Sequence, residues 1–134
     1  MPSKDFLALN PGFNAVDMPG ANRASKYGNR KVQADGYVFD SHAESARYGQ
    51  LQLMVSAGAI SDLRVHPIYE LQRAFVDRVG VRQRAIYYEG DFEYWEKGKK
   101  ICEDVKGTEV AVFRIKRKLF LYNYPHIELR IIKV

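Results

Sequence analysis

The stretch ICEDVKG, residues 101–107, decides how the rest of the chain is organised. It predicts a short strand that ends at Gly107 and carries an acid and a lysine two residues apart. Because side chains two apart on a strand share a face, ~7 Å from one another, Asp104 and Lys106 project together while Glu103 takes the opposite face. Such a pair suits the holding of a divalent metal and the steering of a water molecule toward phosphorus. It is also common as a solvated surface ion pair, so the rest of the chain has to supply the other parts.

The composition indicates one soluble domain with an anionic partner. The chain has 134 residues, of which 46% are hydrophobic and 28% charged, which is ordinary for a globular protein of one domain. The net charge of +5 favours nucleic acid or another polyanion, although solvated lysines alone give such an excess. The single cysteine, Cys102, excludes an internal disulfide and a cysteine-based zinc site, and the three histidines lack zinc-ligand spacing.

The sequence predicts neither a membrane span nor a signal peptide. No apolar run approaches the ~20 residues that a membrane span needs, and the N-terminus lacks a signal-peptide core. We therefore expect a cytoplasmic protein, in the host cytoplasm if it is phage-encoded, with no membrane partner. Residues 1–26 are rich in Pro, Gly, Asn and Ser without a period and predict a flexible arm. A dimer strap or a DNA-contacting arm is the alternative, and residues 27–134 form the expected domain.

The first half of this domain predicts a hairpin, a helix and two strands. Asp-Gly at 35–36, flanked by apolar residues, is a strong hairpin signal. A helix is expected from 41 to 57, stopped by Gly58. Short strands are expected over 60–64 and 68–72. The expected apolar stripe of the helix comprises Ala43, Ala46, Leu51, Met54 and Val55, with Tyr48 nearby.

The second half predicts a central hairpin, a helix and a closing strand. Residues 74–80 read as a loop or turn, and 82–95 as one long strand that Lys97-Gly98 turns back into 99–106. Both strands of this hairpin are expected to be central. Thr108 is the expected N-cap of a helix to 124, and 126–134 the closing strand. The expected buried side of that helix comprises Val110, Phe113, Phe120 and Tyr124. This order predicts an α/β sheet with helices on its faces.

The predicted hairpin brings two acids together. Asp91 lies across the ladder from Asp104, within a residue or two of register, and cross-strand neighbours are ~5 Å apart. Carboxylates that close repel each other, and the usual relief is a raised pKa or a bound cation. Oxygen ligands favour Mg²⁺ or Mn²⁺ over zinc. The alternative is that each acid is separately solvated or paired with an Arg or Lys.

Glu44, in the first turn of the first helix, has two possible roles. Ser41-x-x-Glu44 is a capping box, in which Glu44 accepts from the backbone N–H of Ser41. A first-turn glutamate aimed at the sheet could equally approach a metal, directly or through water. The residues alone leave both readings open.

Three segments in order carry a resemblance to a known family. FDSHAESARY (39–48), GDFEY (90–94) and ICEDVKG (101–107), followed by a basic helix, resemble the PD-(D/E)XK nuclease superfamily, and within it a small, largely phage-borne family. The resemblance extends from about Lys26 to the C-terminus. It implies a restriction-endonuclease-like mixed sheet flanked by helices.

The resemblance also implies site residues. Asp91 and Asp104 correspond to the two direct metal ligands, Glu44 to the helix glutamate that supports the metal site, and Lys106 to the lysine that orients the attacking water and stabilises developing charge. Gly90 stands where the superfamily name has Pro. Two further acids are assigned away from the catalytic set: Glu103 faces the opposite side, and Glu93, on the face of Asp91, is expected to be solvated rather than a supplementary ligand.

The function that follows from the resemblance is Mg²⁺- or Mn²⁺-dependent hydrolysis of DNA. Basic residues on the last helix are expected to hold the phosphate backbone, with an ordinary solvated helix face as the alternative. They comprise Arg114, Lys116, Arg117 and Lys118. Arg82 and Arg84 are weaker candidates for the same role.

The expected substrate is branched DNA. Small single-domain members of the superfamily resemble Holliday-junction resolvases, and two symmetric cuts require a two-fold homodimer. A flap, end-processing or recombination nuclease is the alternative among enzymes. A DNA-binding accessory protein that has lost catalysis is the alternative from another class.

Overall fold

The computed structural model describes residues 32–134, so the arm expected over residues 1–26 lies outside the described residues. In chain order the elements are β1 (Val32–Ala34), β2 (Tyr37–Phe39), α2 (His42–Ser56), β3 (Ser61–Val65), β4 (Ile68–Gln72), β5 (Phe75–Val76), β6 (Arg82–Gln83), β7 (Ile86–Glu89), β8 (Phe92–Glu96), β9 (Lys99–Lys106), α3 (Ala111–Asn123) and β10 (Ile127–Lys133). Among the described residues, no helix is both long enough and apolar enough to cross a bilayer.

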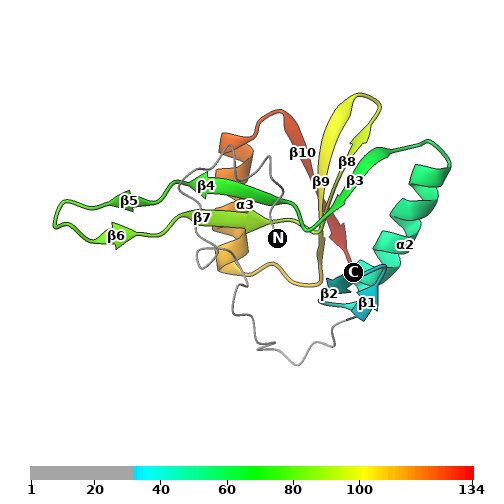
Figure 1. Cartoon of the computed structure of the whole chain (residues 1–134), viewed down its shortest axis with the longest axis horizontal. Coiled ribbons are helices and arrows are strands. Elements are labelled where there is room, and N and C mark those ends of the chain that lie inside the picture. The colour runs from blue at the N-terminus through cyan, green and yellow to red at the C-terminus, as the bar shows by residue number, and fades with distance from the viewer. Residues whose placement is uncertain (1–31) are drawn as a thin grey trace.

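Strand β9, which carries the motif, lies inside a four-stranded sheet of order β10-β9-β8-β3 (Figure 1). β8 and β9 form the expected antiparallel hairpin, with Glu96 opposite Lys99. Both turn residues, Lys97 and Gly98, have positive φ, at 50° and 78°, as a type I′ hairpin turn requires. β10 runs parallel to β9, and because parallel neighbours need a crossover, α3 connects them. The predicted hairpin is confirmed, and both of its strands are central.

A helix packs on each face of this sheet, which confirms the predicted α/β class. Successive residues of β9 point to opposite faces. Ile101 therefore packs with Leu51 of α2 in one core cluster, whereas Cys102 packs with Phe120 of α3 in the other. The same alternation sends Glu103 toward α2 and Asp104 toward α3, so the two adjacent acids of the motif occupy different environments.

Strands β4 to β7 form a long two-stranded ribbon that extends from the body of the molecule (Figure 1). β4 pairs with β7 and β5 pairs with β6, all antiparallel. Residues 74–80, expected to be a loop or turn, form the outer end of this ribbon, including β5 and the turn beyond it. We define the ribbon as residues 68–89.

The prediction of one continuous strand over 82–95 is wrong. The chain breaks at Gly90 and Asp91, where it leaves the ribbon and enters the central sheet. The Gly90 N–H donates to the carbonyl of Pro67, and the His66 N–H donates to the carbonyl of Asp91, each at 2.9 Å. These bonds join residues 66–67 to residues 90–91, the two segments that connect the ribbon to the central sheet. The run of strand-forming residues is therefore divided between two sheets.

Helix α2 begins and ends where the sequence predicts. Ser41 is the N-cap, and its side chain accepts from the Glu44 N–H. Gly58 follows the helix with φ of +74°. The predicted apolar stripe is partly wrong, since Ala46 and Val55 are exposed and Glu44 is buried. The helix instead buries Glu44, Tyr48 and Leu51.

The predicted start of α3 is wrong by two residues. The N-cap is Val110, which makes no side-chain capping bond, and Thr108 precedes the helix. Val110 is exposed rather than buried. Glu109, which would lie in the first turn of a helix capped by Thr108, precedes the helix and accepts from Arg117 at 2.6 Å. This ion pair links the residue before the N-cap to the second turn of the helix.

Gly90 is required by the close approach of three chain segments, and its replacement by alanine should destabilise the fold. A Cβ at this position would lie 2.7 Å from Cys102 Sγ and 3.3 Å from Pro67 Cγ. Proline would also lose the bond from the Gly90 N–H, which accounts for glycine at this motif position. We expect Gly90→Ala to lower the free energy of unfolding by about 1–3 kcal/mol, measured by urea denaturation.

A matched control exists in α2. A Cβ at Gly49 would meet nothing within 4 Å, so Gly49→Ala should be neutral or stabilising by up to ~1 kcal/mol. Gly90→Ala combined with Cys102→Ala should lose less stability than the two single changes added together. Strict additivity would contradict the steric explanation.

Candidate acid and lysine site

Asp91 and Asp104 meet where the β8–β9 ladder ends. The Asp91 N–H donates to the carbonyl of Glu103 at 2.9 Å, and Asp91 Oδ2 accepts from the Val105 N–H at 2.6 Å. These two bonds fix Asp91 beside the motif strand. Its carboxyl group lies within hydrogen-bonding reach of the Asp104 carboxyl. The expected cross-strand proximity of the two acids is therefore present.

Asp104 is buried and held from two sides. The Tyr88 hydroxyl donates to Oδ2, and Lys106 Nζ lies 3.3 Å from Oδ1. The Lys106 ammonium group also lies 4.5 Å from the centroid of the Phe113 ring, a cation–π contact that orients it. The in-phase placement of Asp104 and Lys106 agrees with the sequence interpretation. Tyr88 was not identified from the sequence, because a tyrosine in the run IYYE has the appearance of ordinary strand core.

Glu44 takes part in capping the helix, and its carboxyl group also interacts with the acids of the site. Its N–H donates to Ser41 Oγ at 3.2 Å, and its Oε2 accepts from the backbone N–H of Asp40 at 3.2 Å. The capping is therefore real, although the carboxylate bonds to Asp40 rather than to Ser41. The same carboxyl group interacts electrostatically with Asp104 and Lys106 and with Asp91. The helix cap thus aims its acid at the other two.

Burial and nearby negative charge raise the pKa values of Glu44 and Asp91 and so favour their protonated forms. Desolvation by burial raises the pKa of Glu44 to about 7, with smaller contributions from nearby charges. Desolvation, followed by the charges of Glu44 and Asp104, raises the pKa of Asp91 to about 9. Such shifts mark sites where a cation or a proton is needed to hold acids together.

Two of the three acids fit a divalent cation. Within residues 32–134 no three His, Cys, Asp or Glu side chains stand together as a ready ligand set. Asp91 and Asp104, however, are in hydrogen-bonding reach of one another with Asp91 disposed to keep a proton. A hard cation bound by oxygen ligands would remove the same repulsion that the proton removes. Glu44 acts on this pair through its charge, and its place as a ligand remains a prediction.

Glu103 belongs to a separate structural network. It is completely buried and receives Arg47 Nε at 2.8 Å and Arg47 Nη2 at 2.7 Å. The Tyr94 hydroxyl donates to the same carboxylate. This bidentate ion pair ties α2 to β9, as the assignment of Glu103 to the opposite face allows. Arg47 was not singled out from the sequence, because the i,i+4 spacing of a helix does not reveal a partner 56 residues away.

Glu93 is not the solvated acid that the sequence suggested. Its side chain is buried and accepts from the Tyr69 hydroxyl. Lys100 Nζ lies 3.4 Å from its other oxygen. Glu93 is thus held by a tyrosine of the ribbon and a lysine of β9, so the β8 strand contributes no solvent-facing carboxylate at this position.

The basic residues of α3 divide into two groups. Arg114 and Lys118 are exposed. Arg117 is engaged with Glu109 and lies 5.6 Å from the Phe113 ring centroid. Lys116 is partly buried, and that burial lowers its pKa. The basic helix face expected from the sequence is therefore reduced to two exposed cations, Arg114 and Lys118.

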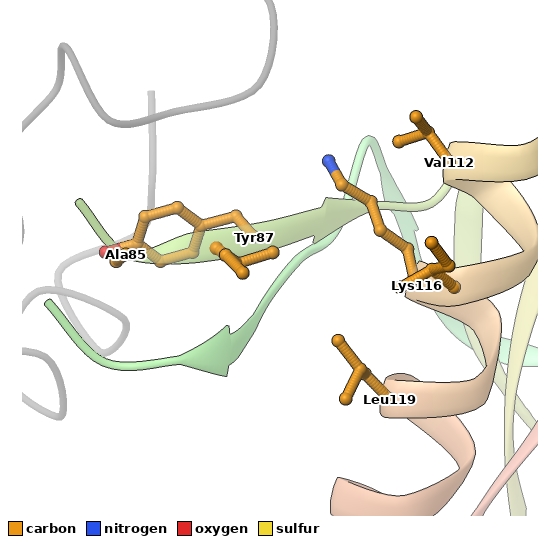
Figure 2. A pocket seen from close by; sticks show the side chains of 7 residues that line it. Ala85, Tyr87, Val112, Lys116 and Leu119 are labelled. Atoms are coloured by element: carbon orange, nitrogen blue, oxygen red, sulfur yellow. The ribbon is translucent and has the colours of Figure 1, made fainter. Parts of the chain in front are cut away.

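Lys116 lines a pocket between α3 and β7 (Figure 2). The pocket has a volume of about 350 Å³ and is mostly apolar. Its lining residues are Ala85, Ile86, Tyr87, Val112, Ile115, Lys116 and Leu119. The acids and Lys106 are absent from this lining, although the Lys116 charge acts on Lys106 and Glu89. This apolar pocket is therefore separate from the acid site.

The raised pKa values predict a loss of stability with increasing pH in metal-free buffer. From about pH 4 upward the unfolded chain releases protons that native Glu44 and Asp91 retain up to about 7 and about 9. The native state then binds more protons, so stability falls through this window. We expect the Tm in EDTA to fall between about pH 5 and 9, and Asp91→Asn to flatten the fall.

Asp77 provides the control, because backbone and side-chain hydrogen bonds lower the pKa of its carboxyl group. Asp77→Asn should leave the decline between about pH 5 and 9 unchanged. Equal slopes in wild type and Asp91→Asn would contradict retention of a proton by the acid pair.

The buried ion pair predicts a large effect of one substitution in α2. Arg47→Ala leaves the Glu103 carboxylate buried without its cation, and we expect a loss of about 3–5 kcal/mol in the free energy of unfolding. Arg64→Ala, at an exposed position of β3, should change stability by less than ~0.5 kcal/mol. Replacing the pair together, as Arg47→Met and Glu103→Leu, should recover much of the loss. Chemical denaturation measures all three, and a mild effect of Arg47→Ala would contradict the pair's importance.

Comparison with known proteins gives a family match. No curated protein and no solved structure matches the chain. Residues 24–134 match the family described as "Protein of unknown function (DUF1064)". Because this match spans most of the sequence, the chain belongs to the DUF1064 family.

Proposed function

We propose that this protein is a metal-dependent endonuclease that hydrolyses phosphodiester bonds of DNA. One observation carries the proposal: the carboxyl groups of Asp91 and Asp104 are within hydrogen-bonding reach, and Lys106 Nζ lies 3.3 Å from Asp104. The partly buried Asp91 and the buried Asp104 are in electrostatic contact with Glu44 and lie beside a lysine. Such a set can hold a divalent metal and direct a water molecule at a phosphodiester. The ordered motifs at 39–48, 90–94 and 101–107 support the same reading.

Asp91 and Asp104 would hold Mg²⁺ or Mn²⁺, with Glu44 supporting the site. When bound, such a cation stabilises the negative charge that develops on the phosphate oxygens. The chain's own residues supply the rest. Tyr88 and the Val105 N–H fix the two aspartates, so their orientation does not depend on solvent. Lys106 can donate to the attacking water and stabilise developing charge, since its ammonium group is held beside Asp104 by the Phe113 ring.

The substrate that we favour is branched DNA in the cytoplasm, cut as by a Holliday-junction resolvase. The domain is small and the net charge of +5 suits a polyanion. Arg114 and Lys118 are the exposed helix cations best suited to hold phosphates. Paired cuts across a junction would require a two-fold homodimer.

The test is cleavage of a four-way junction, a flap and a linear duplex with Mg²⁺ or Mn²⁺. Asp104→Asn should reduce the cleavage rate by ~10³-fold or more, and Lys106→Ala by ~10²-fold. Glu128→Gln, an exposed acid of β10, is the matched control and should cut at the wild-type rate. Cutting of flaps without junctions would replace the resolvase assignment with a flap nuclease.

Thermal melting with Mn²⁺ distinguishes an active nuclease from a DNA-binding protein that has lost catalysis. Millimolar Mn²⁺ should raise the Tm of the wild type by binding the folded state, and Asp91→Asn should remove the shift. Binding of DNA without cleavage in either metal, and without a thermal shift, would favour an accessory DNA-binding protein.

A further inference from the structure

The outer half of the ribbon is strongly basic. Between residues 72 and 85 the sequence has four arginines and a single acid. The arginines are Arg73, Arg78, Arg82 and Arg84, all exposed. The acid, Asp77, is engaged within the turn, where Oδ1 accepts from the N–H groups of Val79 and Val81 at 3.0 Å each. The ribbon therefore presents net positive charge along its outer half.

The tip of the ribbon has a defined conformation. The Asp77 N–H donates to the Val81 carbonyl at 2.9 Å, and the Gly80 N–H donates to the Asp77 carbonyl at 3.0 Å. Gly80 has φ of +86°, a conformation that favours glycine. Gln83 Nε2 donates to Asp77 Oδ2 at 2.9 Å. Val79, at the end of this turn, is 81% exposed. The arginines are thus displayed by a preorganised element, which lowers the entropy cost of binding.

The base of the ribbon is fixed beside the acid pair. Tyr69 of β4 and Tyr88 of β7 both pack edge-on against Phe120 of α3, with ring centroids 4.9 and 5.4 Å apart. Tyr88 also donates to Asp104. β7 then runs through Gly90 directly into Asp91. The base of the ribbon is therefore anchored by residues that include a direct contact of the acid pair, Tyr88.

The length of the ribbon matches one turn of duplex DNA. Gly80 at the tip and Asp91 at the acid pair are eleven residues apart in sequence. At ~3.3 Å per residue of extended strand this is at most ~36 Å, which is the length of ~10 base pairs. A two-stranded ribbon fits the major groove of B-DNA.

We infer that the ribbon is a DNA-binding arm that lies along the duplex flanking the cleavage point. Its arginines contact phosphates, and its tip reaches about one helical turn from the phosphate that is cut. The inference rests on the proposed function only in taking DNA as the substrate. It adds a binding surface that is remote from the acid pair. The contribution of this surface to DNA affinity depends on the length of duplex on one side of the cut.

Binding is tested with Asp104→Asn as the background, so that the DNA is not cut. One four-way junction carries arms of ~20 base pairs, and a second is truncated to ~5 base pairs, shorter than the estimated reach of the ribbon. Arg78→Ala with Arg82→Ala should weaken binding of the long junction by ~10-fold or more. The slope of the logarithm of the binding constant against the logarithm of salt concentration should become shallower by roughly 0.9 for each phosphate that the variant no longer neutralises. The truncated junction should bind this variant and its parent equally.

The matched control is Arg64→Ala with Lys99→Ala, which removes the same charge from exposed positions of β3 and β9. It should bind both junctions within ~2-fold of its parent. Thermal melting of each variant checks that the fold is intact. Equal losses in the ribbon and control variants, or a loss that is independent of DNA length, would overturn the inference.

Failure of the arm and failure of the nuclease proposal give different results. If wild type cuts DNA but the ribbon variant binds DNA like the control, the inference that the ribbon binds DNA is wrong and the nuclease proposal is kept. If wild type cuts nothing but the ribbon variant loses only length-dependent binding, the nuclease proposal falls and the arm stands.

Discussion

The close approach of Gly90 to Cys102 and Pro67 is the constraint on which the rest of the site depends. At this point the chain passes from the ribbon into the central sheet, and it does so with room for a hydrogen atom but not for a methyl group. The next residue, Asp91, is thereby set against β9, where the Val105 N–H and the Glu103 carbonyl bind it. The acid pair therefore depends on a backbone contact, because its two carboxyl groups would repel each other when both are ionised.

The alternation of β9 then separates two kinds of buried acid that are adjacent in sequence. Glu103 is neutralised by Arg47 in a bidentate ion pair on the α2 face. Asp104, on the other face, has Lys106 for a cation but also the carboxyl groups of Asp91 and Glu44 nearby. One face is therefore electrostatically complete, whereas the other holds more acid than base, as a cation-binding site would. Burial enforces the difference, because solvent cannot screen the repulsion.

Positive charge is distributed over two surfaces that flank this acid pair. On α3, contacts with Glu109 and the partial burial of Lys116 reduce the exposed basic set to Arg114 and Lys118. On the ribbon, the arginines remain exposed on an element whose turn is fixed by Asp77. The two elements are packed together where Tyr69 and Tyr88 of the ribbon contact Phe120 of α3. A long polyanion that contacts both surfaces would therefore be bound by elements that pack directly beside Asp91 and Asp104.

Features that depend on local geometry could be predicted from the amino-acid sequence. Two-residue turns at 35–36 and 97–98, the caps of α2 and the period of two along β9 follow from steric preferences of the backbone. The α/β class, the central hairpin and the opposite faces of Glu103 and Asp104 were therefore predictable. The remaining features depend on contacts between residues that are distant in the sequence, so the tertiary structure alone decides them. These features are the break at Gly90, the ribbon, the partners Arg47 and Tyr88, and the burial of Glu93. Each of them arises from packing between residues far apart in the chain, which no local sequence pattern contains.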